Sequence, residues 1–446
     1  MRLIYGIILN MKLTYTYKLK PTKDQVVKMK TWLNLLRLQY NYRLAERFNW
    51  WSENRCDINS CSIVSCSIAP LKDRPTKYGQ VNDLPNSKKL FPQYKDIYSQ
   101  VLQECVIRVD KTFERFIKGS QSRTRVKSVE GTGVDFKGNR SGKPRFKPRS
   151  RYRSFTYPAV SRDCLQGKYI NLPKLGNIKV ILHRPMPSGF KIKTATITSK
   201  ADGWFVNLSL EDKSVPEVKP DINLEKICGI DVGLKEFLVT SDGEVVAIPQ
   251  FARKSQKRLK LLNKNLSRKR QKGTRNRAAA GKRLSLHYQK VARQRRDFHF
   301  KVAKKLLDKY DVVAHEDLNV KGLAKTRLAK SILDAGWTQF TSILTFACKL
   351  VPRLPRNSKA ARAAKAGLLT VAVNPRGTSQ NCSSCGTKVP KTLKDRVHSC
   401  PHCLLQIDRD LNAAINVSRT AEGHPVVKAC GVRQDTGTMK QEAPTN

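Results

Sequence analysis

Residues 11–20 alternate between apolar and polar side chains, the period of two that predicts a half-buried β-strand. After Pro21 the period lengthens, and apolar residues recur every three or four positions over residues 23–53, which predicts a helix. A second helical pattern covers about residues 94–118. The chain therefore begins with one strand, and we predict a helical region over residues 21–118.

Short alternating segments return over residues 169–210 and predict an antiparallel β module, barrel-like in form. Before them, residues 119–151 are rich in Gly, Ser, Lys and Arg and predict a flexible basic loop. The loop ends in GKPRFKPRSRYRSF, where aromatic rings alternate with cations. This mixture suits a single strand or an RNA, although any one of its Arg residues could equally lie on a strand edge.

A linker is predicted at residues 216–223, and the pattern then becomes that of an α/β domain. Apolar runs at residues 227–232, 311–318 and 368–373 predict buried strands, and Ser-Asp-Gly at 241–243 predicts a hairpin turn. Helices are predicted at residues 331–350 and 411–417. The fold class expected from these patterns is α/β with more than one domain.

Residues 253–296 carry eighteen Lys or Arg and no acidic residue. Leucines at helical spacing predict a pair of helices here, split near Gly273 and Gly281. A solvated surface helix normally carries charges of both signs. One-sign charge on this scale favours a groove for a polyphosphate.

The whole chain of 446 residues has 86 Lys plus Arg against 35 Asp plus Glu, a formal charge of +51. Nucleic acid is the partner that such an excess favours. No apolar run approaches the roughly 20 residues of a membrane span, and residues 3–9 are too short for a signal peptide. We expect a cytoplasmic prokaryotic protein, nucleoid-associated when on DNA, whose true start is either Met1 or Met11.

Two Cys-x2-Cys pairs are separated by fourteen residues and predict a structural zinc site. The four ligands leave no open position; they are Cys382, Cys385, Cys400 and Cys403. Gly386 follows the first pair, whereas Leu404 follows the second, where glycine is also favoured. His398 and His402 are rival ligands that we expect to face outward.

Acidic residues stand within or beside separate buried elements that the sequence predicts. Asp231 lies within a buried strand, Glu316 ends another, and Asp408 and Asp410 precede the final helix. A buried carboxylate is costly unless it is paired or binds a metal. In a protein that binds a polyanion, three such acids suggest Mg2+, with Asp408 open to a simpler role as a helix cap.

Several segments together resemble the TnpB family of transposon-encoded, RNA-guided DNA endonucleases, relatives of type V CRISPR effectors. The resemblance covers nearly the whole chain. It is carried by GIDVG from residue 229, HEDLNVKGLAK from 315, NPRGTSQNCSSCG from 374, DRDLNAAINV from 408, and the N-terminal YKLKPT, RVDKTFERF and KPRFK segments.

The resemblance implies an RNase H-like RuvC nuclease domain whose metal-binding acids are Asp231, Glu316 and Asp410. The family's D-x-N pattern selects Asp410 over Asp408. The resemblance also implies a division into domains. Residues 1–20 and 119–222 would form a wedge β-barrel, into which a helical recognition domain of residues 21–118 is inserted. Residues 223–373 and 407–420 would form the RuvC domain, residues 374–406 an inserted four-cysteine zinc ribbon, and residues 421–446 a disordered tail.

By the same resemblance, the expected activity is hydrolysis of DNA phosphodiester bonds by two Mg2+ ions, with Mn2+ as a substitute. The expected partners are a noncoding guide RNA and double-stranded target DNA, with no membrane, as a monomer or a dimer. The alternatives are a DNA strand-transferase and a non-catalytic RNA-binding regulator. Residues 353–367 and Leu404 depart from the family pattern without removing an acid or a zinc ligand.

Overall fold

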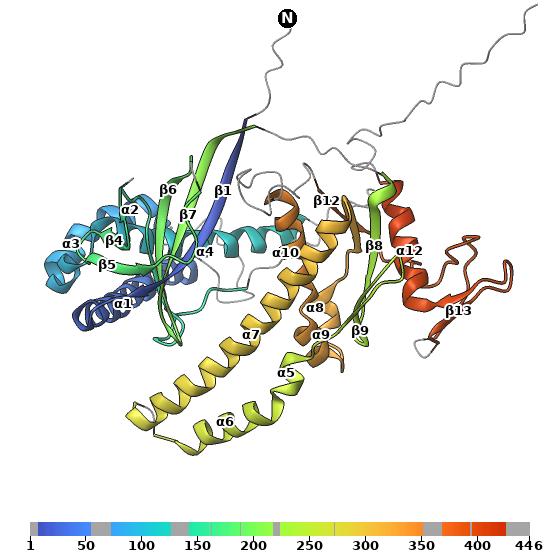
Figure 1. The fold of residues 1–446 in the computed structure, drawn as a ribbon. Coiled ribbons are helices and arrows are strands. Elements are labelled where there is room, and N and C mark those ends of the chain that lie inside the picture. Colours follow the sequence, from blue (N-terminus) through green and yellow to red (C-terminus); the bar gives the residue numbers. More distant parts are fainter. Residues whose placement is uncertain are drawn as a thin grey trace, which may run out of the picture. The chain divides into compact units, whose positions relative to one another are not determined.

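The computed structural model describes two compact units, Met1–Pro216 and Glu217–Asn446 (Figure 1). The described residues are 8–54, 73–125, 142–161, 163–187, 189–216, 224–271, 273–350, 368–392 and 395–424. The insertion at 353–367, most of the linker at 216–223 and most of the tail at 421–446 lie outside them. Each unit has its own sheet.

The N-terminal unit contains a seven-stranded antiparallel sheet in the order β2-β6-β7-β1-β5-β4-β3. Its strands are β1 (Ile8–Lys20), β2 (Ser154–Tyr157), β3 (Leu165–Gln166), β4 (Tyr169–Leu172), β5 (Gly176–Ile181), β6 (Lys191–Lys200) and β7 (Gly203–Pro216). The first strand is central and pairs with β7 along most of its length. An antiparallel module is therefore confirmed, and its closure into a barrel stays a prediction.

Helices follow β1 in this unit: α1 (Lys23–Glu53), α2 (Lys77–Asn82), α3 (Leu84–Leu90), the 3-10 helix η1 (Pro92–Asp96) and α4 (Ser99–Arg125). A capping box formed by Thr22 and Gln25 starts α1. Trp32 is fully buried against Phe155 of β2, with ring centroids 5.6 Å apart. Helix α4 continues past the predicted end at residue 118, because a helix of 27 residues tolerates the single Gly119.

The C-terminal unit contains a mixed five-stranded sheet in the order β10-β9-β8-β11-β12. The strands are β8 (Ile227–Val232), β9 (Glu236–Thr240), β10 (Val245–Ala247), β11 (Val312–Glu316) and β12 (Leu369–Val373). Strands β8, β11 and β12 run parallel to one another, and β9 and β10 extend the sheet antiparallel beyond β8. The predicted strands and the hairpin turn are confirmed.

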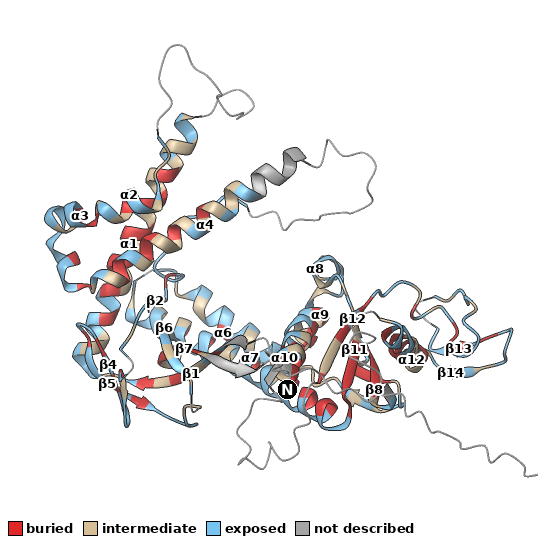
Figure 2. Ribbon diagram, turned by 90° about the horizontal axis from the view of Figure 1, so that it is seen from above, coloured by how far each residue is buried: buried red, intermediate tan, exposed pale blue. Residues whose placement is uncertain are grey.

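Both faces of this sheet are covered, as a parallel sheet requires (Figure 2). On one face, Val312 and Ala314 pack with Val417 of α12 (Arg409–Glu422). On the other face, Val313 packs with side chains of α7 (Arg275–Lys309) and α10 (Trp337–Leu350). Because successive side chains of β11 face opposite sides of the sheet, the C-terminal unit has one apolar core on each face of the sheet.

The remaining helices are η2 (Leu224–Lys226), α5 (Phe251–Lys254), α6 (Gln256–Arg268), α8 (Val320–Leu323) and α9 (Ala329–Ala335). The predicted break at Gly273 is confirmed, with φ +90°, between α6 and α7. The predicted break at Gly281 is wrong: this residue lies inside α7, where one glycine among good helix formers is tolerated. Of the helices that the structure describes, none is long and apolar enough to span a membrane.

Candidate active site

Four cysteines gather at one point in the C-terminal unit. The sulfur atoms of Cys382, Cys385, Cys400 and Cys403 all lie within 4.8 Å of one another. The Cys382–Cys403 and Cys385–Cys400 sulfur pairs are 3.5 Å apart, too far for a disulfide of about 2.05 Å. Four sulfurs at these separations suit the corners of a tetrahedron around one Zn2+.

The two cysteine pairs form matching turns. In the first, the amide of Gly386 donates to the carbonyl of Cys382 at 2.9 Å, and in the second, Leu404 donates to Cys400 at 3.0 Å. Gly386 has φ +75° and Leu404 has φ +60°. The left-handed position that glycine fills in the first turn is therefore filled by an exposed leucine in the second.

The two histidines near the cysteines differ. His402 is exposed, as expected. The expectation for His398 is wrong, because its side chain is fully buried and its Nδ1 contacts Nζ of Lys391. His398 lies in β13 (Val397–Ser399), which pairs with β14 (Gln406–Asp408), and the alternation of this short hairpin turns the ring inward.

Two of the predicted acids lie at the same edge of the sheet. Asp231 lies near the end of β8 and Glu316 ends β11. The two strands are parallel neighbours, with His315 opposite Ile230, so their carboxyl ends meet. Both carboxyl side chains are partly buried.

Asp410 enters from the first turn of α12, which packs on β8 and follows the cysteine-bearing segment. Burial, and then the negative charges of Glu316 and Asp410, raise the pKa of Asp231 to about 7. Burial also raises the pKa of Glu316. Glu316 and Asp410 therefore both lie within electrostatic reach of Asp231, where a bound cation would relieve the repulsion.

A glycine permits this close approach of helix and strand. A Cβ on Gly229 of β8 would lie 2.1 Å from the carbonyl oxygen of Ala414 and 2.4 Å from the amide nitrogen of Ser418, both in α12. Real Cβ atoms do not come so close to backbone. The first glycine of the GIDVG motif therefore sets the depth at which α12, and with it Asp410, sits against the sheet.

Asp408 and Asp410 have different roles in the structure. Oδ1 of Asp408 accepts hydrogen bonds from the amides of Asp410 and Leu411 at 2.8 and 3.2 Å, so Asp408 caps α12. Oδ1 of Asp410 instead contacts Nη2 of Arg409 at 3.2 Å, and its side chain is only 17% exposed. Of these two aspartates, Asp410 is the one whose negative charge contributes to the raised pKa of Asp231.

Amide side chains of α12 hold the segment that leads into the first cysteine pair. Oδ1 of the fully buried Asn412 accepts from the amide of Ser383 at 2.9 Å, and its Nδ2 donates to the carbonyl of Asn381 at 2.8 Å. Nδ2 of Asn416 donates to the carbonyls of Thr378 and Asn381 at 2.9 and 2.7 Å. The cysteine cluster is thereby fixed to the helix that carries Asp410.

Thr378 connects this segment to the acids, because its hydroxyl donates to Oε1 of Glu316. Sequence reasoning missed Thr378, Asn412 and Asn416 as parts of the site. The two asparagines stand four residues apart and so share one face of α12, which is a signal that the sequence does carry. Thr378 has no comparable signal.

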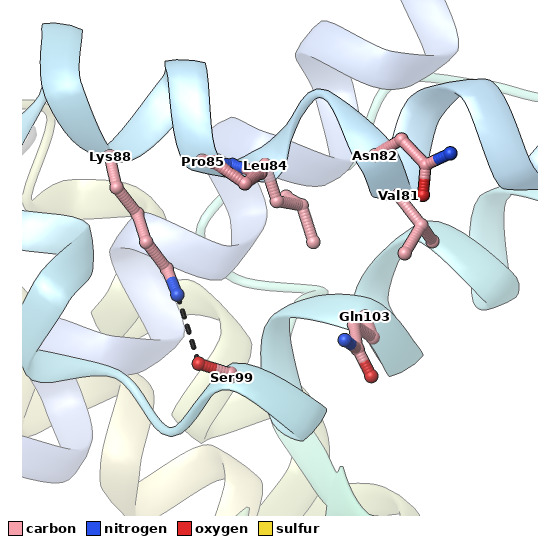
Figure 3. A pocket seen from close by; sticks show the side chains of 7 residues that line it. All are labelled: Val81, Asn82, Leu84, Pro85, Lys88, Ser99 and Gln103. Carbon is pink, nitrogen blue, oxygen red and sulfur yellow. Dashed lines mark hydrogen bonds between the residues drawn. The ribbon is translucent and has the colours of Figure 1, made fainter.

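A separate pocket of about 420 Å³ lies in the helical part of the N-terminal unit (Figure 3). Val81 and Leu84 contribute apolar surface to it, and Nζ of Lys88 donates to Oγ of Ser99 at 2.9 Å along one side. None of its lining residues is acidic or a cysteine. It therefore offers no set of metal ligands like those at the sheet edge.

Three family models match parts of the chain. A model described as "Probable transposase" matches residues 210–327, "Cas12f1-like, TNB domain" matches 357–417, and "Helix-turn-helix domain" matches 11–56, a range that contains most of β1 and all of α1. The first model covers Asp231 and Glu316. The second covers Asp410 and all four cysteines.

Curated relatives match over much greater lengths. A "Putative RNA-guided DNA endonuclease" of Streptomyces pristinaespiralis is 27% identical over 413 residues, 91% of this chain and 88% of the relative. "Putative RNA-guided DNA endonuclease InsQ" of Escherichia coli (strain K12) is 27% identical over 368 residues, 79% and 81% of the two chains. "TnpB-like protein L79" of Acanthamoeba polyphaga mimivirus is 28% identical over 213 residues, 46% and 39%.

These matches support the predicted membership of the TnpB family. The matched regions include every residue that the sequence nominated for a metal site.

Proposed function

We propose that this protein is an RNA-guided DNA endonuclease that originates from a transposable element. The names of the relatives that match most of its length support this activity. The observation that carries the proposal is the placement of Asp231 and Glu316 at one edge of the C-terminal sheet, with Asp410 of α12 within electrostatic reach of Asp231.

The architecture supports an RNase H-like RuvC nuclease domain. Parallel β8 and β11 deliver two acids to one edge, and α12 delivers the third from the face that it covers. In the proposed division of the chain, residues 223–373 and 407–420 form this domain and residues 374–406 form the zinc ribbon. Residues 21–118 would form the recognition domain, and residues 1–20 and 119–222 a wedge barrel.

The three carboxylates fit a divalent metal site. They are oxygen ligands, as Mg2+ and Mn2+ prefer. Burial raises the pKa of Asp231 and of Glu316, and the negative charges of Glu316 and Asp410 raise that of Asp231 further, so a bound cation would stabilise the charged forms. A pair of Mg2+ ions would supply activation of water and stabilisation of the leaving 3′ oxygen. The four cysteines fit Zn2+ equally well, and they would stiffen the segment that precedes Asp410.

The chain's own residues then have distinct tasks. Asp231, Glu316 and Asp410 would bind the metal and hold the scissile phosphate opposite it. Thr378 orients Glu316 through its hydrogen bond, and Asp408 keeps the first turn of α12 in place.

The cationic helices would bind the nucleic acid. Most Lys and Arg side chains of α6 and of the first half of α7 are exposed, while apolar residues such as Leu262 and Leu284 lie buried between the helices. A guide RNA paired with a DNA strand presents phosphates on both strands to such a surface. In this mode of recognition, base pairing reads the sequence and the protein reads the shape of the backbone.

The decisive experiment uses the protein purified with its cellular RNA. The RNA is sequenced, and plasmid DNA that carries the matching site is incubated with the complex and Mg2+. We expect cleavage that depends on the match. Absence of cleavage with the correct RNA would refute the endonuclease, and covalent joining of 3′ ends would instead identify a strand-transferase.

A matched pair of variants tests the assignment of the third acid. Asp410→Asn should abolish cleavage while leaving RNA binding intact, as should Asp231→Ala and Glu316→Ala. Asp408→Asn should remain active, because asparagine caps a helix about as well as aspartate. If Asp408→Asn is inactive and Asp410→Asn cleaves normally, the assignment is reversed.

A further inference from the structure

Residues 142–152, the GKPRFKPRSRY segment, run beside α1 in the N-terminal unit, and the structure divides their side chains into two groups. Lys147 and Tyr152 point into the unit, where Tyr152 is 5% exposed. The outward group consists of exposed side chains only: Lys143, Arg145, Phe146, Arg149 and Arg151. The aromatic and cationic residues that alternate along the sequence are therefore sorted by the structure into buried and exposed positions.

The inward group anchors the segment. The side chain of Asn41 in α1 accepts from the amide of Lys147 at 2.8 Å and donates to its carbonyl at 3.1 Å, so it clamps the backbone at this residue. Nζ of Lys147 lies 3.9 Å from the ring centroid of Tyr40 and 5.6 Å from that of Tyr152. Burial lowers the pKa of Lys147. Its ammonium group therefore serves as a cation–π anchor.

The neighbouring Phe146 is held on one side and open on the other. Its ring packs against Phe48 with centroids 5.6 Å apart and planes at 73°. Phe48 in turn packs on the fully buried Phe113. Even so, 51% of Phe146 is exposed. An exposed aromatic ring on a clamped backbone loses little conformational freedom when something stacks on it.

Three arginines surround Phe146 in the segment. Arg145, Arg149 and Arg151 have no carboxylate at ion-pair distance among the residues that the structure describes. The segment turns at Pro148, whose carbonyl accepts from the amide of Arg151 at 2.9 Å. An open ring flanked by unpaired guanidinium groups complements a strand with bases and phosphates, and it would repel a basic protein surface.

We propose that Phe146 is a stacking platform for an unpaired base of a bound nucleic-acid strand, with Arg145, Arg149 and Arg151 on the adjacent phosphates. This inference rests on the proposed function, because it assigns one contact surface of the RNA–DNA complex. Lys147, in contrast, makes no phosphate contact. Base stacking on an aromatic ring accepts every base, so the platform binds strands without reading their sequence.

Stacking is tested with the full-length protein, freed of RNA by nuclease and a high-salt wash, in the absence of Mg2+. The probes are a single-stranded RNA and a DNA of the same sequence, each containing 2-aminopurine, whose fluorescence falls on stacking. Phe146→Ala and Phe146→Leu should weaken binding of at least one probe by roughly five- to 150-fold and reduce the quenching. Phe146→Trp should retain both the affinity and the quenching of the wild type.

The control is Tyr169→Ala, which removes an exposed aromatic ring of β4 elsewhere in the same unit and should bind like wild type. An effect on the RNA probe alone assigns the platform to the guide, and an effect on both assigns it to any unpaired strand. Wild-type affinity and quenching in Phe146→Leu for both probes would overturn the proposal.

The division of the cations is tested by the salt dependence of the same binding. Arg149→Gln should lower the slope of log K against log salt by about one, because one phosphate contact is lost. Lys147→Met should leave this slope unchanged and lower the Tm. The opposite pattern would overturn the division. Since neither assay requires cleavage, an inactive Asp231→Ala protein should pass both, and failure of this inference is distinguishable from failure of the nuclease proposal.

Discussion

The hydroxyl of Thr378 donates a hydrogen bond to Oε1 of Glu316, while the carbonyl of the same threonine accepts one from Asn416 of α12. Thr378 stands four residues before the first cysteine of the cluster. Thr378, through its side chain and its backbone, thus connects a proposed metal ligand, the helix of another proposed ligand and the cysteine-bearing segment. Such outer partners orient the groups that bind a metal.

Removing that hydroxyl should impair the metal site without unfolding the protein. We expect Thr378→Val to reduce single-turnover cleavage about 10- to 100-fold at limiting Mg2+, and to shift the Mg2+ dependence to higher concentration. Thr378→Ser keeps a donor and should recover most of the activity. Cleavage by Thr378→Val at the wild-type rate across the Mg2+ titration would show that Glu316 needs no orienting partner.

The contact of Gly229 with α12 predicts an unusually harmful alanine substitution. Because the added Cβ would overlap the backbone of Ala414 and Ser418, helix and strand must separate. Gly229→Ala should lower the free energy of unfolding by about 1–3 kcal/mol or more, and cleavage should fall further as Asp410 is displaced.

Gly281 is the matched control for that substitution. It lies inside α7, and the nearest atom to an added Cβ is Cδ1 of Leu266 at 3.9 Å. Gly281→Ala should be neutral or stabilise the protein by up to about 1 kcal/mol. Chemical denaturation of both variants gives the comparison, and equal effects would contradict the packing argument.

Much of the C-terminal unit could be predicted from the sequence because its signals are local. Apolar runs mark β8 and β11, and the cysteine spacing marks a four-sulfur cluster that the structure brings together. The positions of the acids nominate them: Asp231 lies within a buried strand, Glu316 ends another, and Asp408 and Asp410 precede the final helix. The family pattern selects Asp410 over Asp408. The capping role of Asp408 now gives that choice a physical reason.

The features of the fold and the site that the sequence does not reveal depend on contacts between residues that are distant in the chain. Gly281 and Gly336 look alike in the sequence, yet one is inside a helix and the other ends α9 with φ +68°, where the chain crosses close to Arg295 and His299. Likewise, the role of Thr378 exists only because β11 and the cysteine-bearing segment meet. No local pattern carries that information.

Leu404 holds a backbone conformation that costs a leucine roughly 1–2 kcal/mol and costs glycine little. Because 82% of this side chain is exposed, its removal forfeits little packing. Leu404→Gly should therefore raise the Tm and slow the release of zinc to a chelator. Gly386→Leu, the reciprocal change in the first turn, should do the opposite. A faster zinc release from Leu404→Gly than from wild type would rule out strain at this position.

His299 lies in the core between β9 and α10, with its ring stacked at 5.4 Å on Phe237 and at 5.8 Å from Phe340. Its Nε2 donates to the carbonyl of Ala335 at 2.9 Å, and its Nδ1 has no partner among the described residues. A second proton would therefore enter an apolar core. Burial, with a smaller contribution from the charge of Arg295, lowers the pKa of His299 below 6.5.

This lowered pKa predicts a local loss of stability in acid. The unfolded chain takes up the proton near pH 6.5 while the folded core resists it, so stability that is complete above that pH is lost as the pH falls through the lower folded value. Hydrogen exchange of α7 and α10 peptides reports opening of this core. Between pH 7.5 and 5.5, protection should fall more in wild type than in His299→Gln, which can still donate to Ala335. The exposed His183→Gln should behave like wild type, and an identical pH response in His299→Gln would show that this histidine does not set the acid limit of the core.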